Sequence, residues 1–278
     1  MELFAQHSPL WLAGLAAALL VTGFVAGIMA GLLGVGGGIV IVPVLYHLFT
    51  LLGIDESVRM HVTVGTSLAT IIPTSIMSSR AHRKRGSLDM SLIKRLMPGV
   101  VVGVILGSIA SGVLSGAVLT AVFACVALVV ALNMAFKRDG FAQRDGLPGT
   151  AGTALLGGGI GGVSTLMGIG GGTLSVPILN ALRVPMHTAV GTGAMLGMVI
   201  SVPGAIAFLV NGLGVPLRPP FSLGYVNLLG MALIVPMTML TTGWGAQLAH
   251  RTDARLLRRL FAVFLALTAA RMFYGLLT

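Results

Sequence analysis

Ten apolar segments occupy most of the 278-residue chain, and they restrict its fold more than any other feature. Segments of about twenty residues can cross a hydrocarbon layer about 30 Å thick. The runs are continuous rather than alternating, which disfavours a β-barrel. The sequence therefore predicts an all-α polytopic membrane protein. The approximate limits are 10–33, 38–52, 61–79, 96–114, 117–136, 150–167, 172–182, 187–210, 223–242 and 257–276.

Lysine and arginine gather in three short loops between these segments. Residues 80–95, 137–147 and 250–259 hold thirteen of the seventeen, and Arg183 adds one. Such loops face the cytoplasm, which predicts a multi-pass protein of the bacterial cytoplasmic (inner) membrane with both termini outside. The net charge of +10 is then explained by loops that set the orientation of the protein in the membrane, and no nucleic-acid partner is expected.

Two motifs occur twice in the chain. GVGGGIVIVPVL at 34–45 matches GIGGGTLSVPIL at 168–179, and MHVTVGTS at 60–67 matches MHTAVGTG at 186–193. Because five segments separate the copies, the second copy enters the membrane from the opposite side, which predicts an inverted-topology repeat of about five segments per half. The predicted halves are residues 1–136 and 150–278 of one membrane domain, joined by a cytoplasmic connector at 137–149.

A glycine cluster precedes each of the two shortest segments, 38–52 and 172–182. These segments are either tilted spans or half-helices that turn back at mid-membrane. Glycine lets the backbone leave helical geometry and brings bare N–H groups toward a ligand. A helix N-terminus carries about half a positive charge, so two facing N-termini predict an anion site. The expected substrate-binding residues are Gly36, Gly37, Gly38, Ile39, Gly170, Gly171, Gly172, Thr173, Thr66, Ser67 and Thr192.

Other residues in the repeats have supporting or alternative roles. Pro43 and Pro177, five residues after the clusters, are expected to support the helix breaks. His61 and His187 occupy matching positions and are either contacts for a proton or an anion, or interfacial histidines at a helix start. A hydroxyl such as that of Thr192 can instead bond back to the i−4 carbonyl. Glycines at four-residue spacing are expected to pack helices closely: Gly23, Gly27 and Gly31, and Gly99, Gly103 and Gly107.

The apolar segments contain no acidic side chain, because all seven lie at the terminus or in loops. A cation would meet no carboxylate there, although backbone carbonyls remain open to an ion such as Na⁺. No metal or cofactor is expected. No paired Asp, HExxH or Ser–base arrangement is present, so no enzyme is expected either. The glycine clusters also lack the strand and the acidic residue of a nucleotide-binding fingerprint.

The duplicated motifs GLLGVGGGIVIVPVL and GIGGGTLSVPIL, with HVTVGTS, HTAVGTG and HRKRG, resemble the sulfite exporter TauE/SafE family of membrane permeases over essentially the whole chain. The resemblance implies an anion permease for sulfite or small organosulfonates that works by alternating access of two inverted halves. It implies an anion-site role for the six clustered glycines and Thr173. Related thiosulfate permeases that rely on cysteines are excluded, because the single Cys125 lies outside these motifs.

The direction of transport follows from the membrane potential. A negative interior pushes an anion outward with about 2.3 kcal/mol per charge per 100 mV, so export is expected. The alternatives are a carrier or channel for another small anion, such as a carboxylate or halide, and a non-transporting membrane scaffold. The expected partners are a small anion and the lipid bilayer. A homodimer, proton coupling, and rocking or elevator motion remain open.

Overall fold

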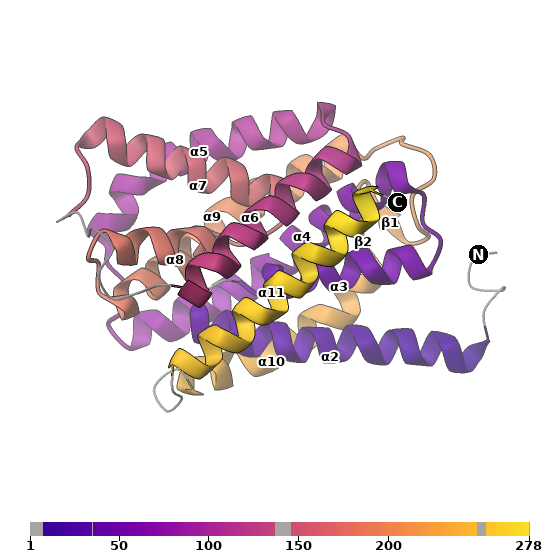
Figure 1. The fold of residues 1–278 in the computed structure, drawn as a ribbon, viewed down its shortest axis with the longest axis horizontal. Coiled ribbons are helices and arrows are strands. Elements are labelled where there is room, and N and C mark those ends of the chain that lie inside the picture. The colour runs from indigo at the N-terminus through magenta and orange to yellow at the C-terminus, as the bar shows by residue number, and fades with distance from the viewer. Residues whose placement is uncertain (1–7, 35, 137–145, 249–253, 278) are drawn as a thin grey trace.

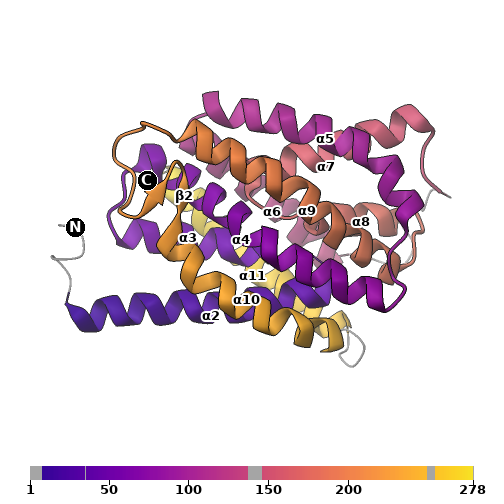
Figure 2. The ribbon, with the colours of Figure 1, turned by 180° about the vertical axis from the view of Figure 1, so that it is seen from behind.

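Nearly all regular structure is helical in the computed structural model, which describes residues 8–34, 36–136, 146–248 and 254–277. These residues contain ten helices, one for each predicted apolar segment, which confirms the all-α prediction (Figures 1 and 2). The helices are α2 (Pro9–Leu33), α3 (Gly38–Leu51), α4 (Glu56–Lys84), α5 (Met90–Val113), α6 (Gly116–Phe136), α7 (Thr150–Met167), α8 (Gly172–Ala181), α9 (Met186–Asn211), α10 (Leu228–Leu248) and α11 (Ala254–Leu277).

A short antiparallel hairpin between α9 and α10 was not expected from the sequence. Its strands are β1 (Ser222–Leu223) and β2 (Val226–Asn227), with Gly224 in the left-handed conformation at the turn. Asn227 then starts α10, because its Oδ1 accepts a hydrogen bond of 2.8 Å from the N–H of Gly230. The ninth apolar segment therefore becomes helical at Leu228, five residues later than predicted.

Six helices of the described chain are long and apolar enough to cross a membrane: α2, α4, α5, α9, α10 and most of α6. Large apolar side chains of α5, such as Ile105 and Ile109, are exposed and provide a surface that lipid can cover. Figure 1 shows that α2 begins and α11 ends at the same end of the bundle, opposite the end where α4, α6 and α10 finish. The described helices that precede the three basic loops thus finish at one end, as the charge pattern predicts.

Helices α3 and α8 are too short to cross the membrane. With 14 and 10 residues they measure about 21 and 15 Å at about 1.5 Å per residue, against about 30 Å of hydrocarbon. Figure 1 shows α3 leading back to the end where α2 begins, whereas α8 leads to the opposite end. Both are half-helices, so the chain turns back after each glycine cluster.

The most extensive helix contacts pair α5 with α7 and α10 with α2, while α4 crosses α9 and α6 packs on α11. A Cβ atom built on Gly103 would overlap the carbonyl oxygen of Gly158 in α7, and one on Gly31 would overlap that of Thr242 in α10. Gly23, Gly27, Gly99 and Gly107 make equally close approaches to the same two helices. The packing role predicted for these six glycines is confirmed.

Candidate functional site

The two helix breaks lie against one another inside the protein. One joins α2 to α3, and the other joins α7 to α8. A Cβ atom built on Gly38 would lie 2.7 Å from the carbonyl oxygen of Gly168 and 3.0 Å from the Cα of Ile169. The hydroxyl of Ser67 on α4 donates a 2.6 Å hydrogen bond to the same Gly168 oxygen. The sequence places the breaks in different halves, and the fold brings them into contact.

Glycine serves the two breaks in different ways. Gly36 and Gly37 have φ angles of 71° and 82°, in the left-handed region that other residues rarely adopt. In the second break only Gly168, with φ of 67°, is left-handed, and Gly171 has an ordinary φ of −53°. Gly171 is instead required for close packing, because a Cβ there would lie 2.8 Å from the Cβ of Leu196.

The hydroxyl of Ser75 on α4 lies between the breaks. Its Oγ lies 3.2 Å from a Cβ atom built on Gly36 and 2.6 Å from a Cβ atom built on Gly197. The Cβ atom built on Gly197 lies 3.8 Å from the backbone nitrogen of Gly171. Ser75 is fully buried and its hydroxyl has no hydrogen-bond partner in the described part of the chain. The other buried hydroxyls of α4 all have a partner: Thr63, Thr66, Ser67, Thr70, Thr74, Ser78 and Ser79.

Further unpartnered hydroxyls surround the second break. A Cβ built on Gly193 would lie 2.8 Å from the Cα of Gly172 and 3.0 Å from the Oγ of Ser175. The N–H groups of Gly171 and Gly172 make no hydrogen bond to a described residue. The site thus offers neutral donors and no charge. The buried hydroxyls without a partner in this half, counting described residues only, are Ser164, Thr173, Ser175, Thr192 and Ser201.

Two of the predicted site hydroxyls are already hydrogen-bonded. Thr66 accepts a 2.8 Å bond from the N–H of Asn227, so it anchors the hairpin, and Ser67 anchors the second break. Neither bonds back to its own helix. Ile39 is fully buried in the first turn of α3. Thr173 and Thr192 keep an unpartnered hydroxyl, as described above.

Pro43 and Pro177 lie inside α3 and α8 rather than at their starts. Each is the sixth residue of its half-helix. Since proline has no N–H, the carbonyls of Ile39 and Thr173, four residues earlier, lose their helical donors. The prolines therefore leave matching acceptors in the first turn of each half-helix.

The two matched histidines lie in different surroundings. His61 is 6% exposed, its Nε2 lies 3.1 Å from the carbonyl oxygen of Leu114, and its ring stacks on Tyr225 with centroids 4.9 Å apart. His187 is exposed at the start of α9. The difference arises because the hairpin segment covers His61, and the structure does not bring the two together.

Acidic side chains of the described chain lie at helix starts. Asp55 caps α4 and Asp89 caps α5 through bonds to backbone N–H groups. The hydroxyl and then the N–H of Ser57 bond to the Asp55 carboxylate and lower its pKa. No group of three His, Cys, Asp or Glu suited to a metal occurs among the described residues.

Sequence reasoning missed Ser75, Ser201 and Gly197. A signal was available, because Ser75 and Ser201 are 126 residues apart, the same offset that relates MHVTVGTS to MHTAVGTG. This serine pair lies about two turns beyond the end of the matching motifs in α4 and α9. Gly197 carries no such signal, since its importance depends on which side chain faces it.

Comparison with known proteins agrees with this architecture. The family model described as sulfite exporter TauE/SafE matches residues 19–272. The chain belongs to the TauE/SafE family. A probable membrane transporter protein of Haemophilus influenzae is 35% identical over 257 residues, covering 91% of this chain and 96% of the relative. The probable membrane transporter protein YunE of Bacillus subtilis is 26% identical, covering 92% and 96%.

A more distant relative is the probable membrane transporter protein MJ0441 of Methanocaldococcus jannaschii, 25% identical over 79% of this chain and 81% of its own length. No solved structure matches the chain. With its apolar helices, membership of the TauE/SafE family makes the protein a membrane transporter. The family and these relatives agree with the prediction of a transporter rather than an enzyme.

Proposed function

We propose that this TauE/SafE transporter exports a small anion, sulfite or a small organosulfonate, by alternating access. One observation carries the proposal: the buried, unpartnered hydroxyl of Ser75 lies between two glycine breaks that touch. A buried donor without an acceptor costs about 1–3 kcal/mol, so such groups are rare unless a ligand uses them. An anion between the breaks accepts this bond together with others.

Magnitudes show how many donors the anion needs. A helix end contributes at most about 2 kcal/mol, whereas transfer of a bare anion into an apolar medium costs tens of kcal/mol. Hydrogen bonds to a charged group add about 1.5–3 kcal/mol each, so four or more are required. The hydroxyls of Ser75, Thr173 and Ser175 and the N–H groups of Gly171 and Gly172 supply that number. A carboxylate or halide uses the same donors, and competition assays separate these solutes.

Alternating access rests on the relation between the halves. The pairing of α5 with α7 matches that of α10 with α2, as expected for an inverted repeat of residues 1–136 and 150–278. The half-helices α3 and α8 approach the site from opposite ends (Figure 1). Rocking of one half against the other about the touching breaks then exposes the site to each side in turn.

The test compares two glycine-to-alanine variants in proteoliposomes loaded with radiolabelled sulfite. Gly197→Ala places a methyl group against Ser75, whose side chain can rotate, so the protein folds but loses a donor and space. We expect efflux to fall at least about tenfold, the cost of one charge-assisted bond. Gly159→Ala is the control, since nothing lies within 4 Å of its Cβ. Full efflux from Gly197→Ala contradicts the site, and efflux that ignores an imposed potential contradicts electrogenic export.

A further inference from the structure

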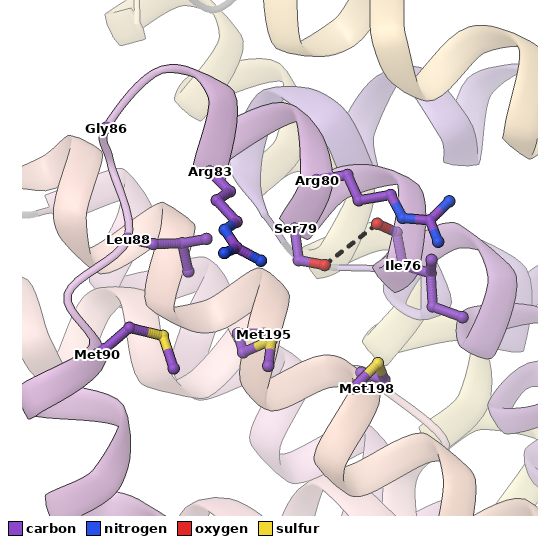
Figure 3. A pocket seen from close by; sticks show the side chains of 9 residues that line it. All are labelled: Ile76, Ser79, Arg80, Arg83, Gly86, Leu88, Met90, Met195 and Met198. Carbon is purple, nitrogen blue, oxygen red and sulfur yellow. Dashed lines mark hydrogen bonds between the residues drawn. The ribbon is translucent and has the colours of Figure 1, made fainter.

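A cavity of about 510 Å³ opens at the end of the bundle that carries the basic loops (Figure 3). Arg80 and Arg83, near the end of α4, line one side of it. The facing side consists of Met90 from α5 and Met195 and Met198 from α9. Figure 3 shows the Arg83 side chain directed from α4 toward Met195 and Leu88.

The cavity lies next to the site between the breaks. Ile76, which lines it, follows Ser75 on α4, and Met198 follows Gly197 on α9. The cavity lining therefore includes the residue that follows Ser75 on α4 and the residue that follows Gly197 on α9. A solute that enters from the basic end reaches this cavity before it reaches the breaks.

The lining combines two cations with an apolar surface. Arg80 and Arg83 are exposed, and a guanidinium binds oxyanions through paired N–H bonds. Asp89, a nearby carboxylate in sequence, caps α5 instead by accepting from the N–H groups of Ser91 and Leu92. The hydroxyl of Ser79 donates to the carbonyl oxygen of Ile76, as Figure 3 shows.

The volume is larger than an inorganic anion needs. Pockets for organic ligands measure about 300–1,000 Å³, and one water takes about 30 Å³ of liquid. A four-atom anion such as sulfite leaves most of a 510 Å³ cavity without contact. A solute with a charge at each end would place one charge against the methionines, which is unfavourable.

We infer that this cavity binds an organic oxyanion with a short aliphatic chain, with Arg80 and Arg83 holding the charged group and Met90, Met195 and Met198 contacting the chain. The inference rests on the proposed transport of anions and narrows its substrate class. The arginines recruit the solute, and the methionines select it by the length of its apolar part.

Binding of linear alkanesulfonates tests this assignment by calorimetry on the full chain in phosphatidylcholine nanodiscs. From methanesulfonate to pentanesulfonate, Kd should fall about threefold per added methylene, whereas sulfite and sulfoacetate should bind no better than methanesulfonate. Arg83→Gln should weaken every alkanesulfonate about tenfold. Lys84→Gln removes the same charge from the next residue. Lys84 does not line this cavity; it lines a neighbouring one that Arg80 and Arg83 also border, so the substitution should leave Kd unchanged.

A second variant separates chain recognition from charge. Met198→Gln should flatten the dependence of Kd on chain length and keep the affinity for methanesulfonate. Three results overturn the inference: sulfite binds as tightly as pentanesulfonate, Lys84→Gln weakens binding as much as Arg83→Gln, or added phosphatidylglycerol displaces pentanesulfonate, which would identify a lipid headgroup as the occupant.

Failure of the inference differs from failure of the proposed function. If sulfite efflux is observed but Kd does not depend on the chain length of the alkanesulfonate, the transport proposal stands and the cavity assignment is wrong. If alkanesulfonates bind and the variants behave as expected, but no anion is transported, the cavity assignment stands and the transport proposal is wrong.

Discussion

Ser75 is the exception among the buried hydroxyls of α4. The neighbouring Thr74 is hydrogen-bonded to the carbonyl oxygen of Thr70 and to the hydroxyl of Thr238, whereas Ser75 bonds to no described residue. A buried hydroxyl without an internal acceptor is tolerated when a bound ligand accepts its hydrogen bond. Within one helix, the hydroxyl of Thr74 therefore stabilises the fold, whereas that of Ser75 is available to a ligand.

This contrast predicts opposite effects of two substitutions. Ser75→Ala removes no internal hydrogen bond, so the free energy of unfolding should stay level or rise by about 1 kcal/mol. The KM for the anion should rise on the order of tenfold to a hundredfold, the value of one bond to a charged group. Thr74→Val should lower the free energy of unfolding by about 1 kcal/mol and leave KM unchanged. Thermal unfolding and efflux assays measure both, and an unchanged KM in Ser75→Ala would remove this serine from the site.

The glycine breaks could be located from the sequence, but the hydroxyls that face them could not. Gly37 and Gly171 carry a local signal, because clustered glycines interrupt a helix whatever surrounds them. Thr66 and Ser75 lie nine residues apart on one helix and are both buried. Only the fold shows that the first is taken by Asn227 while the second has no partner.

At the scale of elements, the starts of the two short helices were the best-predicted part of the fold, whereas the sequence left open whether these helices span the membrane or turn back. The predicted starts at Gly38 and Gly172 are the observed ones, because the break and the following apolar run are both local features. The hairpin at 222–227 was missed, because two-residue strands leave no alternating pattern to detect. Its stability comes from contacts with α4 and α9 that are distant in sequence.

The close packing of α5 on α7 predicts a substitution that harms the fold and spares the site. Gly103→Ala places a methyl group onto the backbone of Gly158, which must move, at a cost of about 1–3 kcal/mol. The midpoint of thermal unfolding in detergent should drop, and the KM of the folded fraction should remain that of the unmodified protein. Gly159→Ala, with no neighbour within 4 Å, should change neither quantity. Equal midpoints for the two variants would mean that α5 and α7 are not held this closely.

At the scale of the whole molecule, the basic residues predict which end faces the cytoplasm. We expect a cysteine at Arg85 to react with an impermeant maleimide only after cells are permeabilised, and one at Leu213, at the opposite end, to react in intact cells. Both are exposed, so access depends on sidedness alone. The single native cysteine is first removed by Cys125→Ser. The reverse labelling pattern would invert the orientation and place the arginine-lined cavity at the outer face of the membrane.

The hairpin makes the two ends of the bundle unequal. Between α4 and α5, only residues 85–89 connect the helices, whereas residues 212–227 fold over the end of the bundle where α9 finishes. There the N–H of Asn227 bonds to Thr66 and Tyr225 stacks on His61, contacts with no equivalent among the described residues of the other end. Widening the hairpin end requires breaking these contacts, while the arginine-lined end can part without such a cost. In its resting state the carrier should therefore be open at the arginine-lined end. Release of the solute at the hairpin end should then limit the rate of each transport cycle.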